Sequence, residues 1–234
     1  KGSEENSTVA GVASDASGWY SSAFGYNSLA TGRESLAAGY KNTANGLSSS
    51  SVGWQNSADG DYASSFGYEN KASGKWSSAF GYKNTAGRLG SSAFGYYSTA
   101  NGEYSSAFGY RNTASGNWSS AFGYNSTANG EYSSAFGYKN TASREYSSAF
   151  GYDNIASREY SSAFGNQNRA SGEYSSAFGY ENTASGIESS VFGSEYQVTG
   201  ERSGAFGVGT ATWNSTTKVF DYGYINEGKN SYMF

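Results

Sequence analysis

A strict 14-residue period runs through almost the whole of this 234-residue chain. A glycine in the segment Ser-Ser-Ala-Phe-Gly-Tyr and its variants recurs at every fourteenth residue from Gly25 to Gly207, and Gly11 extends the series by one step. We take this glycine as position 0 of the repeat and number the other positions from it. Spacing without an insertion or a deletion means that each repeat is one structural turn stacked on the next. It predicts a β-solenoid of about fifteen coils.

Each repeat contains two segments with the character of strands. Residues 105–110 alternate with period 2, which is typical of a strand, and residues 112–114 form a plausible second, shorter strand. Asn and Gly near the junctions supply turn conformations. No 3.6-residue periodicity indicates a helix. The sequence therefore predicts an all-β fold in which two short strands and two turns make one flat coil.

Phenylalanine at position −1 is the predicted core of the coil. All 14 phenylalanines of the chain lie in this one column, and position +5 is almost always alanine. We expect Phe to face the coil interior and to pack against this small alanine, while Ser at −4, Ala at −2 and Gly at 0 form an opposite face suited to contacts between subunits. The predicted core ladder is Phe66, Phe80, Phe94, Phe108, Phe122, Phe136, Phe150, Phe164 and Phe178.

Composition argues against several classes of function. The net charge is −4 and no Lys/Arg cluster occurs, which argues against nucleic acid as a partner and against direct contact with an anionic membrane. The chain has no His and no Cys, so nucleophilic triads and thiol or zinc chemistry are absent. The acidic residues do not follow the nonapeptide spacing of calcium-binding β-rolls. We expect a protein that is not an enzyme and that uses no cofactor and no metal.

Two features of one edge of the repeat are candidate binding features. Position −5 carries a ladder of Tyr and Trp, and position +8 carries a column of Glu, where Arg144 and Arg158 replace the neighbouring turn glycine at +7. These features either seal the edge and compensate charge, or offer amphipathic contact area to a protein or a glycan. The candidate ligand-binding residues are Tyr104, Trp118, Tyr132, Arg144, Tyr146, Arg158, Tyr160 and Tyr174.

The repeat resembles the head domain of YadA-like trimeric autotransporter adhesins. The resemblance rests on residues 105–109, on Asn112, Ala114 and Gly116, and on their repetition along most of the chain. It implies a left-handed parallel β-roll, a homotrimer, and display on a Gram-negative cell surface, anchored to the outer membrane through regions C-terminal to this segment. The family's aliphatic pair is replaced here by Ser and Phe, so the core column is aromatic. The sequence leaves open whether Phe faces the roll interior or the trimer axis.

The resulting prediction has three parts along the chain. Residues 1–8 are an irregular lead-in, residues 9–207 form the head of 14-residue repeats, and residues 208–234 are degenerate terminal coils that keep the Phe phase to Phe220 and Phe234. The resemblance implies a virulence-associated adhesin that binds host glycoproteins multivalently, with collagen, fibronectin or a CEACAM-type receptor as candidate partners. Two alternatives stay open: an ice-binding solenoid that uses the Thr column at +4, interrupted by Ile155 and Arg169, and a spacer that displays another domain.

Overall fold

The computed structural model describes residues 6–208, 211–214, 219–222 and 225–233. The described residues form strands, turns, bends and short irregular segments, and none of them is in a helix. The chain divides into two compact units, Lys1–Trp118 and Ser119–Phe234, and each is described by itself.

Unit 1 contains one long and one short strand for each coil, at positions −3 to +1 and +4 to +5. The long strands are β1 (Thr8–Val12), β3 (Ser22–Tyr26), β5 (Leu36–Tyr40), β7 (Ser50–Trp54), β9 (Ser64–Tyr68), β11 (Ser78–Tyr82), β13 (Ser92–Tyr96) and β15 (Ser106–Tyr110). The short strands are β2 (Asp15–Ala16), β4 (Leu29–Ala30), β6 (Thr43–Ala44), β8 (Ser57–Ala58), β10 (Lys71–Ala72), β12 (Thr85–Ala86), β14 (Thr99–Ala100) and β16 (Thr113–Ala114).

Unit 2 repeats the same arrangement. Its long strands are β17 (Ser120–Tyr124), β19 (Ser134–Tyr138), β21 (Ser148–Tyr152), β23 (Ser162–Asn166), β25 (Ser176–Tyr180), β27 (Ser190–Ser194), β29 (Gly204–Val208) and the shorter β33 (Tyr232–Met233). Its short strands are β18 (Thr127–Ala128), β20 (Thr141–Ala142), β22 (Ile155–Ala156), β24 (Arg169–Ala170), β26 (Thr183–Ala184), β28 (Gln197–Val198) and β32 (Ile225–Asn226).

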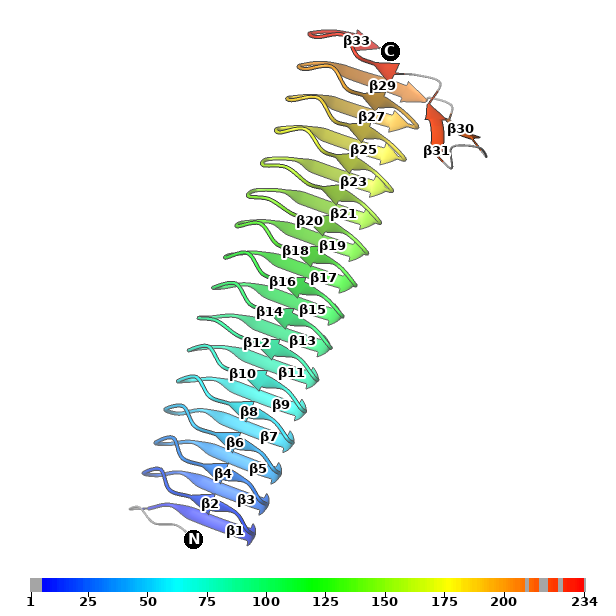
Figure 1. The fold of residues 1–234 in the computed structure, drawn as a ribbon. Coiled ribbons are helices and arrows are strands. Elements are labelled where there is room, and N and C mark those ends of the chain that lie inside the picture. Colours follow the sequence, from blue (N-terminus) through cyan, green and yellow to red (C-terminus); the bar gives the residue numbers. More distant parts are fainter. Residues whose placement is uncertain (1–5, 209–210, 215–218, 223–224, 234) are drawn as a thin grey trace. The chain divides into compact units, whose positions relative to one another are not determined.

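Within each unit the long strands form one parallel sheet and the short strands form another (Figure 1). The register is one repeat per step, so that Phe80 pairs with Phe94 in unit 1 and Phe136 with Phe150 in unit 2. Every column of the sequence is therefore a ladder of stacked side chains. This confirms the parallel β-solenoid that the repeat predicts.

The interior of the coil is built from alanine, not from phenylalanine. Ala23 and Ala37 at position −2, together with Ala16, Ala30 and Ala44 at position +5, form one fully buried cluster in unit 1. The same two columns are fully buried in unit 2, for example at Ala135 and Ala142. The two sheets are thus joined by pairs of small residues.

The prediction that phenylalanine faces the coil interior is wrong. The phenylalanines from Phe66 to Phe178 are only partly buried in the isolated chain, and Phe192 and Phe206 are each 56% exposed. Because side chains alternate along a strand, burial of positions −4 and −2 forces position −1 outward. At positions −2 and +5 this interior holds Ala, Ser and, in the last coils, Val191 and Val198, and the phenylalanine rings lie outside it. Of the small-residue face assigned to subunit contacts, Ser at −4 and Ala at −2 accordingly point inward, whereas Gly at 0 is exposed in most coils, for example at Gly137.

A buried asparagine ladder at position +3 closes the turn after each long strand. In unit 2, the Asn154 side-chain amide donates to Phe150 O at 2.9 Å, to Gly165 O at 2.7 Å and to Asn140 Oδ1 at 3.0 Å. The backbone and the side-chain amides of Asn168 donate in turn to Asn154 Oδ1. Serine takes the same place at Ser98 and Ser126. The ladder satisfies carbonyl groups that the turn would otherwise leave buried without a partner.

The position 0 glycine is required by both backbone conformation and space. Gly137 has a φ of +117°. A Cβ atom placed there would lie 2.2 Å from the carbonyl oxygen of Gly151 in the next coil. An L-amino acid with a side chain is strained at this φ, and the neighbouring backbone leaves no room for one.

The C-terminal part of unit 2 contains an insertion into one coil. Strands β30 (Ala211–Asn214) and β31 (Val219–Tyr222) form an antiparallel pair in which Trp213 lies opposite Phe220. β32 and β33 then resume the coil, pairing Gln197 with Ile225 and Gly204 with Tyr232. Phe220 therefore does not continue the phenylalanine ladder, although it keeps its spacing in the sequence. Phe234 lies outside the described residues.

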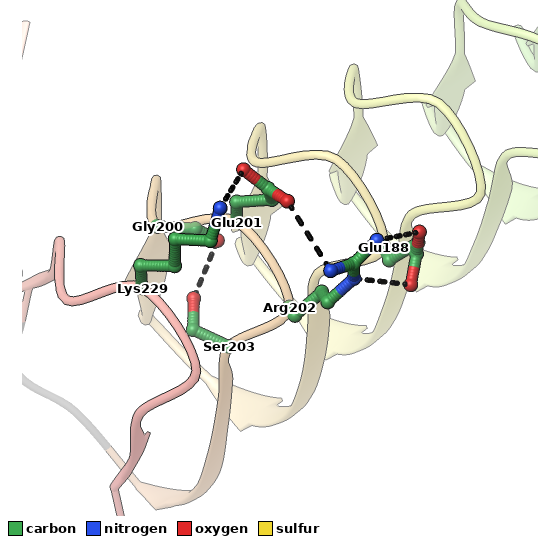
Figure 2. Close-up of polar contacts among 6 residues, drawn as sticks. All are labelled: Glu188, Gly200, Glu201, Arg202, Ser203 and Lys229. Carbon is green, nitrogen blue, oxygen red and sulfur yellow. Dashed lines mark hydrogen bonds and ion pairs between the residues drawn. The ribbon is translucent and has the colours of Figure 1, made fainter.

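Exposed ion pairs link neighbouring coils at this end of unit 2 (Figure 2). Arg202 Nε lies 3.0 Å from Glu188 Oε2 one coil earlier, and Lys229 Nζ lies 3.0 Å from Glu201 Oε2. The hydrogen bond from Arg202 lowers the pKa of the Glu188 carboxyl. Both partners are exposed, so the pair adds little to stability.

Candidate ligand-binding surfaces

The edge ladder, which we define as the aromatic residues at position −5, stands at the turn just before each long strand. In unit 2 its ring centroids are 5.0 Å apart between Tyr132 and Tyr146, 4.9 Å between Tyr146 and Tyr160, and 4.7 Å between Tyr160 and Tyr174. These rings are nearly parallel and 41–50% exposed. The structure thus brings together four of the predicted site residues as one exposed stack.

Unit 1 carries a shorter version of the edge ladder. Tyr104 and Trp118 stack at 6.0 Å, and their exposed fractions are 46% and 45%. The ladder is interrupted at Gly90, where a Cβ would lie 2.6 Å from Cδ1 of the Tyr104 ring. Tyr104 therefore leans over the coil that lacks an aromatic residue.

The edge-ladder residues hold a left-handed backbone conformation. The φ angles of Tyr132, Tyr146, Tyr160 and Tyr174 lie between +54° and +57°. This conformation is uncommon for residues other than Gly, Asn and Asp. Aromatic residues at such a turn carry a conformational cost that stacking and backbone hydrogen bonds to the preceding coil offset. The amide of Tyr146, for instance, donates to Glu131 O at 2.9 Å.

The glutamate column lies beside this stack. Desolvation in the stack raises the pKa of the Tyr146 and Tyr160 hydroxyls, and the charge of Glu145 contributes to both shifts. A tyrosine hydroxyl is protonated at neutral pH even without such a shift, so both groups can donate hydrogen bonds. The edge presents phenol and carboxylate groups in adjacent columns.

Arg144 and Arg158 lie with the glutamates in a polar hollow of about 290 Å³. Arg144, Arg158, Glu159 and Glu173 line the hollow. Both arginines are exposed, and neither forms an ion pair within the part of the chain that the structure describes. Short ion pairs thus do not account for their presence beside the glutamates. A third arginine, Arg88 in unit 1, replaces the same glycine, and a count of that column in the sequence could have found it.

The outward side of the long strands carries two aromatic ladders side by side. We call the residues at position −1 the phenylalanine ladder and the residues at position +1 the tyrosine ladder. Phe136 and Phe150 stack at 4.8 Å, and Tyr138 and Tyr152 at 4.9 Å. At the C-terminal end of the phenylalanine ladder, an apolar hollow of about 390 Å³ is lined in part by Phe178, Phe192, Phe206, Tyr232 and Met233. The phenylalanine ladder is apolar along each unit, whereas the tyrosine ladder of unit 2 is interrupted at Asn166 and at Ser194.

Sequence reasoning missed a pairing of cations with the tyrosine ladder. A basic side chain at position +2 covers the ring that precedes it, with Lys41 Nζ 5.2 Å from the Tyr40 centroid and Lys139 Nζ 5.2 Å from the Tyr138 centroid. Residues at +2 also have positive φ, for example +56° at Lys139. The recurring Tyr-Lys and Tyr-Arg neighbours were the available signal in the sequence.

The threonine column at +4 lies on the outward side of the short strands. Thr85, Thr99 and Thr113 in unit 1 and Thr127 and Thr141 in unit 2 are partly exposed. Arg169 interrupts this column as an exposed side chain in β24. The array is therefore short and irregular.

Two classes of site have no support within the described residues. None of the described residues forms a cluster of carboxylates that could hold a metal ion. In the same part of the chain, no helix is long and apolar enough to cross a membrane.

Comparison with protein families decides the relationship. A profile of the YadA head domain repeat matches residues 3–28, 30–56, 58–84, 72–98, 89–112, 100–126, 114–140, 128–153, 142–168 and 170–195. The chain belongs to the YadA head family. No curated protein matches the sequence closely enough to be named as a relative.

Membership in the YadA head family gives the ladders a context. Heads of this family are adhesin-type domains of surface-exposed autotransporters, and a β-solenoid of this type is typically not enzymatic. In this YadA-like coil, aromatic residues lie on the outward side of the long strands.

Proposed function

We propose that this chain is the head of a homotrimeric adhesin at the bacterial surface, anchored to the outer membrane by regions beyond this segment. The head binds host cell-surface or matrix glycoproteins and catalyses no reaction. The observation that carries the proposal is a regular, exposed stack of tyrosines beside carboxylates and two arginines without ion pairs among the described residues. Contacts of this kind, repeated along the coils and over three chains, add up through effective concentration.

The phenylalanine ladder is the proposed interface between the three chains. It is apolar, continuous within each unit and only partly buried in the isolated chain, up to 56% exposed at Phe192 and Phe206. An exposed apolar patch of this extent marks an interaction surface. Family membership favours further copies of this chain as the occupant.

Charge placed in the phenylalanine ladder should dissociate the trimer. We expect the double variant Phe136→Asp/Phe150→Asp to have the molar mass of one chain, because three pairs of carboxylates would be buried in an apolar interface. Light scattering after gel filtration measures this mass. The control is Thr141→Asp on the outward side of the short strands, which should stay trimeric. A trimeric double variant would place the interface elsewhere.

The edge ladder is the proposed contact surface for the host ligand. Because its rings are stacked at 4.7–5.0 Å, they cover each other's faces and present their edges and hydroxyl groups. Such a surface suits hydrogen bonding to polar protein or glycan groups. Tyrosine provides this contact area at low cost in side-chain entropy.

Removal of the edge ladder should abolish adhesion without dissociating the trimer. We expect Tyr132→Ala/Tyr146→Ala/Tyr160→Ala to lose at least about tenfold in binding to immobilised collagen, fibronectin or host-cell glycoproteins, since buried tyrosine contacts dominate many interfaces. The control is Thr127→Ala/Thr141→Ala on the short strands. If the tyrosine variant binds like the wild type and the threonine variant does not, the threonine face is the binding surface. Thermal hysteresis by the wild type would then support the ice-binding alternative.

A further inference from the structure

In unit 2 the tyrosine ladder is first interrupted at Asn166. The strand register pairs Tyr152 with Asn166 and Asn166 with Tyr180, so an amide stands where each neighbouring coil has a ring. The next residue of the column is Ser194, so Tyr180 has no ring partner among the described residues. Tyr152 and Tyr180 are 45% and 44% exposed. Two tyrosines therefore flank a missing ring.

We propose that this break binds a quaternary ammonium group between Tyr152 and Tyr180. The proposal depends on the spacing of the rings, on the cations that cover the intact ladder, and on the charges around the break. It does not rest on the adhesive function, because none of these observations involves a host glycoprotein.

The spacing suits an alkylated ammonium. Rings of the intact ladder are 4.9 Å apart between Tyr124 and Tyr138 and between Tyr138 and Tyr152. Removing one ring leaves a separation of about 10 Å, or two strand spacings. A nitrogen midway would lie about 5 Å from both ring centroids, within the range for cation–π attraction. The methyl groups of a quaternary ammonium fill such a gap better than a planar cation or a bare ammonium does.

Basic side chains of the chain itself lie over rings of the tyrosine ladder. Lys139 at position +2 places its Nζ 5.2 Å from the Tyr138 centroid, and Arg111 places its guanidinium carbon 5.2 Å from the Tyr110 centroid. Around the break, position +2 is occupied by Asp153, Gln167 and Glu181. The cation that covers the ring in other coils is thus absent here, and two carboxylates stand in its column.

The local charges favour a cation. Asp153 and Glu181 form no ion pair within the described residues. A hydrogen bond to Glu181, together with the negative charges of Glu181 and Glu195, raises the pKa of the Tyr180 hydroxyl. Asn166 Oδ1 is buried and accepts no hydrogen bond from the described residues. The carboxylates of Asp153 and Glu181 thus stand beside two partly exposed tyrosine rings that a cation can contact.

The test is titration of the full chain with choline and with tetramethylammonium, followed by NMR of the tyrosine rings. We expect saturable shifts at Tyr152 and Tyr180, with at least about tenfold weaker binding of ammonium and sodium. Asn166→Tyr restores the ring found in the neighbouring coils, so this variant should fold and should lose choline binding at least about tenfold. Tyr180→Ala should lose a similar amount because one ring face is removed.

The control moves the break to a coil that carries its own cation. Asn166→Tyr/Tyr138→Asn opens an equal gap between Tyr124 and Tyr152, beside Lys139, and should not bind choline. Wild-type protein that does not bind, or an Asn166→Tyr variant that binds as well as wild type, overturns the proposal. Phosphatidylcholine vesicles distinguish the source: binding to free choline and to vesicles assigns a lipid headgroup, whereas binding to free choline alone assigns a small soluble ligand.

Discussion

Gly137→Ala should destabilise the coil by about 3–5 kcal/mol, the sum of backbone strain and overpacking. The φ of +117° is closed to alanine, and the new Cβ would lie 2.2 Å from Gly151 O. Because the next coil is held by its own hydrogen bonds, it cannot move away cheaply. We expect a clear drop in the urea midpoint measured by circular dichroism.

The matched control for this variant is Gly87→Ser. Gly87 lacks a positive φ, and a Cβ there would approach only the flexible end of Asn101. Serine already fills this position at Ser73, Ser115 and Ser143. The control should therefore unfold within about 1 kcal/mol of the wild type. Equal midpoints for all three proteins would contradict the requirement for glycine at position 0.

Asn154→Ala should cost about 2–4 kcal/mol. Its side-chain amide serves Phe150 O, Gly165 O and Asn140 Oδ1, and its own oxygen accepts from Asn168. All of these groups are in or beside the buried ladder, so alanine leaves several of them without a partner. Chemical unfolding followed by circular dichroism measures the loss.

Asn154→Ser is the matched control for the asparagine ladder. Ser126 occupies the same position, donating to Gly137 O at 3.2 Å and accepting from the amide of Asn140 at 3.3 Å. A serine hydroxyl therefore replaces some of the hydrogen bonds of the amide. We expect Asn154→Ser to lower the free energy of unfolding by about half as much as Asn154→Ala. A serine variant that is no better than alanine would show that cavity formation, not hydrogen bonding, sets the cost.

The 14-residue period predicted the fold because a constant spacing gives every coil the same conformation. Identical coils stack in register, with equivalent residues above one another. The period could not predict which side of the strand is inward. Alternation shows that Ala135 and Phe136 point to opposite sides, but either side could have been the core. The distance between the two sheets determines which side of the long strand faces the interior, and the turns set that distance. Those turns use left-handed residues such as Lys139 and Tyr146, which sequence patterns do not reveal.

The candidate site was predicted in part. The sequence placed Tyr132, Tyr146, Tyr160 and Tyr174 in one column, and the structure makes them an exposed stack. The absence of ion pairs at Arg144 and Arg158 among the described residues could be seen only in the structure. The cation–π contacts beside the tyrosine ladder could also be seen only in the structure, because they depend on the direction of the side chains.

The alanine interior has a consequence for how such a head can change. Its two sheets meet through side chains that are almost identical in every coil, such as Ala135 and Ala142. Outward residues touch their neighbours above and below but not the interior, so a substitution in one exposed column leaves the packing of the coil intact. Substitutions at the exposed positions of a single coil can therefore change the binding surface without changing the interior packing. The break at Asn166 is a local edit of this kind, since Ala163 and Ala170 of the same coil remain fully buried.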